Sequence, residues 1–455
     1  MVSSALTVVV GAGISGLTCA YALQKAGHSV LTLEATSRPG GMIQSIAEDG
    51  YVFETGPQSF SSTPALDQLT GELGLMSQLL EGPRAAPRFV LVDRELVAVP
   101  MSPPGFLASR LFGWKTKSAI LTEVLRSTRA PDPDESIAAF TRRKFTAELL
   151  DRLVGPFVSG IYAGDPEQIS LRAAFPRIYE AEQSAGSVVR GMFRAAKSSK
   201  AAANRRPALV SLRPGNAALT SALAAKLGTG LRYDVAVRSI AKTARGFTIR
   251  AQSGRGLEEL PCERVVLASP AHVAASLLAE TAPEAANSLL GIAYAPVAVV
   301  SLAYRREHVR HTLNGFGFLV PRSAAIRTLG TVWNSSQFGG RAPSEHVLLT
   351  SFVGGTTDRE AVNLSDNELS AIVHRELTAI LGISGQPVKE RVSAYPRAIP
   401  QYNLGHIERL QVLRGALLRL PGLWLAGNYL QGPAVGACIG EALSVAEQVR
   451  ISYNS

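Results

Sequence analysis

Cysteine is scarce in this chain of 455 residues, and the three present, Cys19, Cys262 and Cys438, lie far apart. They form no C-x-x-C pair, which argues against a disulfide framework and against structural zinc. The seven histidines are scattered, and the HVRH segment of His308 and His311 lacks further ligands at a recognisable spacing. We therefore expect no metal, and a reduced, cytoplasmic environment.

Long hydrophobic runs are also missing. The longest, from Ile292 to Leu302, is interrupted by Pro296 and Ser301 and falls short of the roughly 20 residues that span a bilayer. The N-terminal residues show neither a basic stretch nor a small-residue cleavage site, and no G-x-S-x-G nucleophile motif occurs. We expect no transmembrane helix, no signal peptide and no serine hydrolase.

Acidic residues are fewer than basic ones: 36 Asp and Glu stand against 46 Lys and Arg, a net charge of +10. Two segments contain no acidic residue at all, Leu96–Thr122 and Gln183–Tyr233. The first interleaves Arg110, Lys115 and Lys117 with large apolar residues. This pattern suits either an amphipathic element lying on anionic lipid or a half-buried helix with a basic edge.

The second acid-free segment has the low-complexity centre KSSKAAANRR, residues 197–206, which contains Lys197, Lys200, Arg205 and Arg206. Such a composition predicts a solvated surface loop. Nucleic-acid binding is the competing interpretation, but no stacking motif or recognised nucleic-acid fold accompanies the charge. We therefore expect no nucleic-acid partner.

Glycines placed between a strand and a helix are the first positive signal. Apolar residues make up 46% of the chain, so it folds, and its length calls for more than one domain. The β-branched run Leu6–Val10 predicts a buried parallel strand and leads directly into GAGISG, residues 11–16, which opens a helical pattern. In this G-x-G-x-x-G order, Gly11 permits the tight turn, Gly13 admits a pyrophosphate, and Gly16 allows close helix–strand packing.

Glu34 ends the next predicted strand, 18 residues after Gly16. Its carboxylate can accept hydrogen bonds from a ribose diol, so the unit predicts a dinucleotide site. Near the C-terminus, the apolar strand of Gly422–Tyr429 also breaks at glycine, and a last helix opens after Gly432. A helix N-terminus aimed at a flavin ring would favour the negative charge of the reduced form, which points to flavin rather than nicotinamide.

Seven segments together resemble the oxygen-dependent, FAD-dependent protoporphyrinogen oxidase family, within the wider amine-oxidase-like flavoproteins. They are GAGISG (11–16), RPGG (38–41), ETGP (54–57), SGIYAGD (159–165), GFGFLVP (315–321), AIPQY (398–402) and LAGNY (425–429), which is followed by GPAVGACI (432–439). The glycine motifs alone are typical of the superfamily, whereas the internal segments point to the porphyrinogen branch. The resemblance extends over nearly the whole chain.

The resemblance implies a mixed α/β and α+β fold in three parts. The Rossmann-like FAD-binding domain would be discontinuous, over residues 1–87, 215–275 and 400–455. A helical, membrane-associating region would cover 94–190, and a mixed-sheet substrate domain 88–93, 191–214 and 276–399. Strand-like runs at Val297–Tyr304, Gly315–Pro321 and Val347–Val353 agree with the mixed sheet.

The resemblance also implies the site residues. Those expected at the FAD are Gly11, Ala12, Gly13, Ile14, Ser15, Gly16, Glu34, Ala35, Arg38, Gly40, Gly41, Met42, Gly56, Pro57, Gln58, Ser59, Val237, Gly427, Asn428, Pro433, Ala434 and Val435. Those expected at the substrate are Arg88, Gly160, Phe316, Gly317, Leu319, Val332 and Phe352. Arg88 would bind a substrate carboxylate through its planar guanidinium. Met42 and Asn428 depart from residues that relatives carry beside the flavin.

The implied activity is the six-electron oxidation of protoporphyrinogen IX to protoporphyrin IX, with O2 as acceptor and the tetrapyrrole as partner. Because the flavin takes the hydride, no catalytic side chain is expected. Four alternatives stay open: coproporphyrinogen III as substrate, an amine oxidase, a carotenoid-type desaturase, and a non-catalytic flavin-binding membrane protein. The resemblance further implies peripheral contact with the inner face of a membrane, and it leaves a homodimer open.

Overall fold

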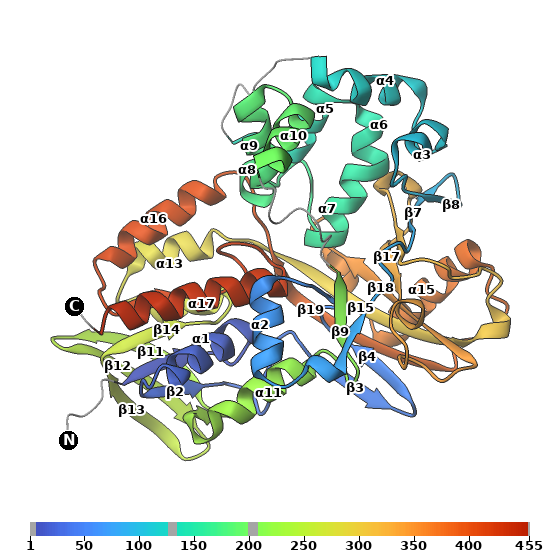
Figure 1. The fold of residues 1–455 in the computed structure, drawn as a ribbon. Helices are drawn as coiled ribbons and strands as arrows, with labels where there is room; N and C mark the ends of the chain where they lie inside the picture. Colours follow the sequence, from blue (N-terminus) through green and yellow to red (C-terminus); the bar gives the residue numbers. More distant parts are fainter. Residues whose placement is uncertain (1–5, 126–133, 199–207, 454–455) are drawn as a thin grey trace.

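The structure is a computed structural model that describes residues 6–125, 134–198 and 208–453 (Figure 1). Lys200, Arg205 and Arg206 of the basic low-complexity segment lie outside these ranges, as does the side chain of Lys197. The described elements form a parallel-sheet part, a part built on a seven-stranded sheet, and a helical part at the top of Figure 1.

A five-stranded parallel sheet forms the first part. Its order is β10 (Leu231–Arg232), β2 (Val30–Leu33), β1 (Thr7–Val10), β14 (Arg264–Leu267) and β20 (Leu423–Leu425). Both faces of β1 are covered, because Val8 and Val10 pack into one hydrophobic core and Val9 into another. This burial on both sides explains why the strand is a continuous valine run rather than an alternating one.

Two helices that follow strands of this sheet determine where a ligand can bind. α1 (Ile14–Lys25) follows β1, and α17 (Val435–Ile451) follows β20. The two helices pack against each other. Since β1 and β20 run parallel, both helices begin at the carboxyl edge of the sheet, where ligands bind in open α/β sheets.

Smaller elements complete this part. The strands are β3 (Ser45–Glu48), β4 (Tyr51–Glu54), β5 (Phe60–Ser61), β6 (Leu79–Glu81), β9 (Leu209–Leu212), β11 (Ala236–Thr243), β12 (Gly246–Ser253) and β13 (Gly256–Cys262). The helices are α2 (Pro64–Glu72), α11 (Ala217–Leu227), α12 (Ala271–Leu278), α13 (Pro283–Leu290) and α16 (His406–Leu418).

A seven-stranded mixed sheet forms the second part. Its order is β19 (Lys389–Pro400), β15 (Tyr294–Arg305), β18 (His346–Gly354), β17 (Thr328–Trp333), β16 (Gly317–Leu319), β7 (Arg88–Val92) and β8 (Glu95–Ala98). Only the β16–β7 pair is parallel. The helix α15 (Asp366–Leu381) packs its apolar side, including Leu369, Val373 and Leu377, into the core with one face of this sheet. These two sheets confirm the expected mixed α/β architecture.

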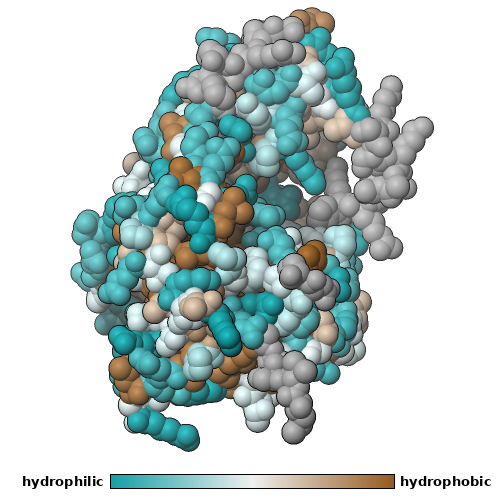
Figure 2. All heavy atoms as spheres, turned by 90° about the vertical axis from the view of Figure 1, so that its left-hand side faces the viewer, coloured by the Kyte–Doolittle hydropathy of each residue, from teal (hydrophilic) through white to brown (hydrophobic). Residues whose placement is uncertain are grey.

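The helical part comprises α3 (Pro103–Ala108), α4 (Trp114–Thr122), α5 (Ile137–Lys144), α6 (Ala147–Leu149), a π-helical turn (Leu150–Val154), α7 (Gly155–Tyr162), α8 (Leu171–Ala174), α9 (Pro176–Ala185) and α10 (Val188–Ser198). Seen from the left of Figure 1, the surface is hollowed below this part (Figure 2). Among the described helices, even the longest, the 17-residue α17, lacks the length and apolarity needed to cross a bilayer.

The first acid-free segment, Leu96–Thr122, contains both buried and exposed residues. Leu111 and Phe112 are buried, and Lys117 is buried with its Nζ donating to the Leu107 carbonyl at 2.7 Å. The burial of Lys117 contradicts the expectation that its charge faces lipid. Trp114 instead is 74% exposed.

The boundaries between the parts differ from the expected ones at four places, one of which is α13: it packs into the core of the parallel-sheet part although it falls in the expected substrate segment 276–399. β8 belongs to the mixed sheet although it lies beyond residue 94, and residues 191–198 continue α10 of the helical part. β9 lies between β5 and β6, in the part that carries the parallel sheet. The expected substrate segment 191–214 is therefore divided between the helical part and the parallel-sheet part. Its residues continue a helix in the first and pair with neighbouring strands in the second.

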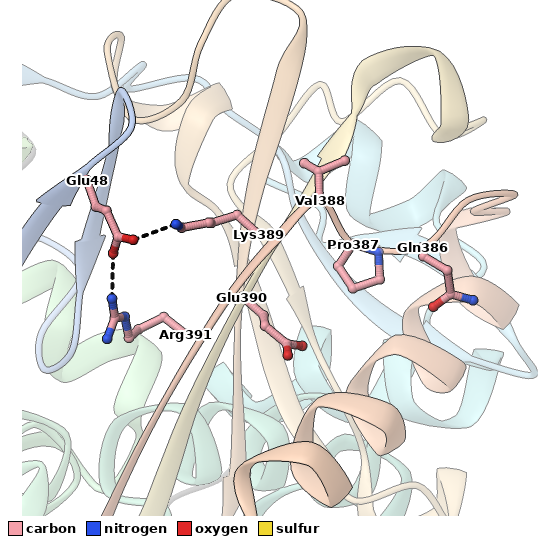
Figure 3. Close-up of a pocket in the computed structure, with 7 residues that line it drawn as sticks. All are labelled: Glu48, Gln386, Pro387, Val388, Lys389, Glu390 and Arg391. Carbon is pink, nitrogen blue, oxygen red and sulfur yellow. Dashed lines mark hydrogen bonds and ion pairs between the residues drawn. The ribbon is translucent and has the colours of Figure 1, made fainter.

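Ion pairs join the β3–β4 hairpin to the mixed sheet. Lys389 Nζ lies within contact of Glu48 and 2.9 Å from Asp49 Oδ2, and Arg391 Nη2 lies 2.6 Å from Glu48 Oε2. Figure 3 shows both basic side chains of β19 pointing at Glu48, beside an open pocket of about 600 Å³. This pocket contains none of the expected site residues, so we assign it to the joint between the two parts.

Candidate cofactor and substrate sites

The glycine turn between β1 and α1 requires a residue without a side chain at two positions, for different reasons. Gly11 has φ +104°, and its N–H donates to the Leu33 carbonyl at 2.8 Å. A Cβ on Gly16 would lie 1.9 Å from the Gly11 carbonyl oxygen, so this glycine permits helix–strand packing. A Cβ on Gly13, in contrast, would meet nothing within 4 Å. The space beside Gly13 is therefore open, as the prediction of a pyrophosphate site requires.

Hydrogen bonds from neighbouring turns fix the carboxylate of Glu34 at the end of β2. Its Oε2 accepts the Ala12 N–H at 2.7 Å, and its Oε1 accepts the N–H and the hydroxyl of Thr36 at 2.9 and 2.7 Å. A carboxylate has about four lone-pair sites, so acceptor capacity remains for a ribose. The structure thus places Glu34, Ala12 and the adjoining Ala35 at one corner of the sheet edge.

The expected RPGG and ETGP loops adjoin this corner. Gly13 and Gly40 form a β-bridge, and a Cβ on Gly41 would come within 3.4 Å of the Gly13 Cα. The Arg38 guanidinium closes its loop by donating to the Gly41 carbonyl at 2.9 Å. A Cβ on Gly56 would lie 1.9 Å from the carbonyl of Met42, so the two loops lie directly against each other.

The C-terminal loop completes the edge. Ala426 N–H donates to the Leu267 carbonyl, so Gly427 and Asn428 follow directly at the end of β20. Pro433, Ala434 and Val435 form the entry to α17, whose first turn contacts the segment after Ser59: a Cβ on Gly436 would meet Thr63 at 2.8 Å. On the other side of the edge, Val235 N–H donates to the Glu34 carbonyl, which brings Val237 of β11 near the ribose corner.

Neither α1 nor α17 has a side-chain cap at its N-terminus, and the first turn of each, which the structure describes in full, contains no acidic residue. Free N–H groups and the positive end of a helix dipole favour an anion. The space beside Gly13, the two uncapped helices and the Glu34 carboxylate therefore suit the phosphates and ribose of a dinucleotide. The role of each residue stays a prediction, but the structure brings the glycine turn, Glu34, the RPGG and ETGP loops and the start of α17 to one sheet edge.

Five expected substrate residues share one face of the mixed sheet. In the observed register, Gly317 pairs with both Arg88 and Val332, and Gly330 pairs with Leu319 and Phe352. Paired residues project to the same side of a sheet, so Arg88, Gly317, Leu319, Val332 and Phe352 lie on the face opposite the α15 core. Their roles toward a substrate stay predictions.

The two remaining substrate residues adjoin this face. The Arg88 Cζ lies 5.4 Å from the centroid of the Phe316 ring, a cation–π distance, and Arg88 is exposed. No carboxylate among the described residues forms an ion pair with Arg88, so its guanidinium is available to an anionic ligand. On the helical side, a Cβ on Gly160 of α7 would lie 2.7 Å from Leu319 Cδ2, so glycine allows α7 to lie close to β16.

A buried polar network between the two sites was not expected from sequence. Asn334 Nδ2 donates to Gln58 Oε1 at 2.7 Å, and Gln58 Nε2 donates to the Glu54 carbonyl at 2.9 Å. The Tyr395 hydroxyl donates to Thr55 Oγ1 at 2.9 Å. Side chains on or next to the mixed sheet thus bond residues 54–58 at two points. The sequence predicts a role for Gln58 and marks Thr55 within ETGP, whereas Asn334 and Tyr395 belong to no motif.

The AIPQY segment connects the same two sites. The Tyr402 hydroxyl donates to the Asn428 carbonyl at 2.8 Å, and Gln401 Nε2 donates to the Tyr162 carbonyl at 2.8 Å. His406 stacks on Tyr402 with ring centroids 4.3 Å apart, and burial lowers the pKa of His406 to about 4. The imidazole is therefore neutral and enclosed, and its Nε2 lies 3.1 Å from the Tyr429 carbonyl oxygen.

Taken together, a sheet edge that suits a dinucleotide and an adjoining sheet face that carries the Arg88 guanidinium are typical of flavoproteins that oxidise a bound organic substrate. Within the described residues, no cluster of His, Cys, Asp and Glu could hold a metal ion.

Comparison with known proteins agrees with this class. Residues 14–450 match the family described as flavin containing amine oxidoreductase. The chloroplastic protoporphyrinogen oxidase of Nicotiana tabacum is 34% identical over 97% of this chain and 85% of its own length. The coproporphyrinogen III oxidase of Bacillus subtilis is 29% identical over 95% of each chain. A crystal structure of a candidate protoporphyrinogen oxidase from Exiguobacterium sp. 255-15 superposes with a TM-score of 0.83, at 26% identity and 99% coverage of both chains.

The chain therefore belongs to the flavin containing amine oxidoreductases and, within them, to the protoporphyrinogen oxidase family. It is a flavoprotein oxidoreductase, and its cofactor is FAD. The family assignment confirms the resemblance that the internal segments indicated.

Proposed function

We propose that this protein oxidises a porphyrinogen, with protoporphyrinogen IX as its substrate and protoporphyrin IX as its product. Bound FAD supplies the two-electron oxidation. The observation that carries the proposal is the face with Arg88 at one end and the uncharged Gly317, Leu319, Val332 and Phe352 beyond it. A large apolar macrocycle with carboxylates on one side matches that distribution.

On this face, each residue has a physical task. The Arg88 guanidinium binds a propionate through two parallel hydrogen bonds, and the Phe316 ring beside it limits where the guanidinium can point. Leu319, Val332 and Phe352 remove water from the macrocycle and so align its reacting carbons. A substrate with four propionates, coproporphyrinogen III, would place two of them against this apolar set, which supports protoporphyrinogen as the preferred substrate.

The anaerobic addition of protoporphyrinogen IX to the purified holoenzyme tests the function. We expect the flavin absorption band to bleach and porphyrin fluorescence to appear, and we expect both to be slower with coproporphyrinogen III. Admission of O2 should restore the flavin band. Porphyrin formation no faster than autoxidation without enzyme would exclude the proposal, and faster turnover of the coproporphyrinogen would reassign the substrate.

The same experiment with Arg88→Ala separates substrate binding from cofactor loading. Loss of a charged hydrogen bond costs about 1.5–3 kcal/mol, so KM should rise by roughly 10- to 150-fold while the spectrum of bound FAD stays unchanged. Arg84→Ala is the matched control, because Arg84 is an exposed arginine nearby whose partner is Glu81. An unchanged KM in Arg88→Ala would remove the role assigned to Arg88.

We also propose that the helical part contacts an anionic membrane from the side of the cytoplasm. Trp114, Leu107, Arg110 and Lys115 are all exposed on or beside α3 and α4. An exposed tryptophan among cations suits the boundary between lipid headgroups and acyl chains. Co-sedimentation with anionic but not with neutral liposomes would support this contact, and equal recovery in both supernatants would exclude it.

A further inference from the structure

Glu441 is a buried carboxylic acid in the part of the protein that carries the parallel sheet. It lies on α17, six residues after Val435, and is only 6% exposed. Its Oε2 accepts the N–H of Gly427 at 3.3 Å. Gly427 and Asn428 form the turn at the end of β20 that is expected to face the flavin. The carboxyl therefore lies directly behind a part of the FAD site.

The surroundings of Glu441 leave its charge uncompensated. Three titratable groups lie close enough for their ionised forms to interact with a Glu441 carboxylate: Cys19 on α1, Cys438 on α17 and Tyr429 in the loop after β20. Burial raises the pKa of both thiols to about 12 and the pKa of the Tyr429 hydroxyl well above its usual value, so all three stay neutral.

The other elements packed against α17 supply no counter-charge either. On α2, the exposed Asp67 bonds Ser62, and Glu72 pairs with Lys25 at the end of α1. No basic group among the described residues forms an ion pair with Glu441. A carboxylate so placed is costly when ionised, and this burial raises the pKa of Glu441 to about 7.

We propose that Glu441 is a positioning residue of the FAD site with a switchable charge: its carboxyl holds the Gly427–Asn428 turn, and its ionisation makes the reduction of bound FAD harder. The sign follows from electrostatics. Reduction adds negative charge to the flavin, and a negative carboxylate in a low-dielectric interior opposes it. Because the pKa of Glu441 is raised, the carboxyl is neutral below about pH 7 and ionised above it.

The proposal rests on the bound FAD and not on the identity of the substrate. Its test is the midpoint potential of FAD in the holoenzyme from pH 5.5 to 9, for the wild type, Glu441→Gln and Thr18→Val. Glutamine keeps a carbonyl for the Gly427 N–H but has no charge. Thr18 is a buried α1 residue whose hydroxyl has no hydrogen-bond partner within the described part of the chain, so its valine variant controls for repacking of this part of the protein.

We expect the potentials of Glu441→Gln and wild type to coincide at pH 5.5 and to separate above pH 7, with the variant more positive; Thr18→Val should follow the wild type. Coincidence at every pH, or the same offset at every pH, would overturn the proposal. If Glu441→Gln does not retain FAD, an infrared measurement on the wild type still tests the proposal. Coupling is reciprocal, so reduction at pH 7 should increase the infrared C=O band of a protonated carboxyl, and no increase would overturn the proposal. Neither readout requires porphyrinogen turnover.

Discussion

Gly16→Ala should abolish FAD binding by breaking the turn that forms the site. The new Cβ would lie 1.9 Å from the Gly11 carbonyl oxygen and 3.0 Å from Ala268 Cβ. The Gly11 backbone cannot move away, because its N–H is bonded to the Leu33 carbonyl. It is also packed closely against the Ala268 carbonyl, from which a Cβ on Gly11 would be only 2.9 Å away. Overpacking of a core by one methyl costs about 1–3 kcal/mol, and a clash with backbone lies at the upper end of that range. We expect a lower Tm and a flavin-to-protein ratio near zero.

Gly13→Ala is the matched control, since the two glycines lie in the same turn. Gly13 has φ −70°, which alanine adopts without strain, and its Cβ would point into open space. The stability of the apoprotein should therefore change by less than about 1 kcal/mol. FAD binding should still weaken, because the methyl group occupies the space for the pyrophosphate. Loss of folding in Gly13→Ala, or full FAD content in Gly16→Ala, would contradict the division of roles between these glycines.

The elements with a strong local pattern were those that the sequence predicted. The Leu6–Val10 run, the helix after it and the strand before Glu34 match β1, α1 and β2 within one or two residues. In contrast, β17 and β19 were not predicted as strands. β19 alternates charged, aromatic and small residues because it is an edge strand of the mixed sheet, partly exposed, and no apolar run marks it.

More of the candidate cofactor site could be predicted from the sequence than of the residues that hold it in place. Glycines at a turn carry their reason in the local sequence, so their positions followed from spacing and resemblance. Asn334, Tyr395 and Glu441 act through partners 276, 340 and 14 residues away, and nothing local distinguishes them from other polar residues. Lys117 was placed with the surface cations for the same reason: only the fold reveals that its ammonium group caps the end of α3.

The second large effect is expected from Lys144 in the helical part. Lys144 on α5 is 1% exposed and lies 3.0 Å from Glu182 Oε1 on α9 and 3.7 Å from Glu123 Oε1. Both carboxylates are fully buried, and Glu123 accepts the N–H groups of Val188 and Val189 at the start of α10. Lys144→Met would leave two buried carboxylates without this ammonium group. Removal of one partner of a buried pair costs about 3–5 kcal/mol, so urea should unfold the helical part at a clearly lower concentration.

Arg142→Met controls for the loss of a positive charge on the same helix, because Arg142 and its partner Glu167 are both about half exposed. An exposed pair contributes about 0–1 kcal/mol, so this variant should unfold close to the wild type. The double variant Lys144→Met/Glu182→Leu should recover only part of the stability that Lys144→Met loses: it removes one of the two buried carboxylates but also the Arg143–Glu182 pair at 2.8 Å, and Arg143 then keeps Glu135 as its partner at 2.7 Å. If Lys144→Met unfolded together with Arg142→Met, the buried charges would have found other partners, and the network would not be what joins α5, α9 and α10.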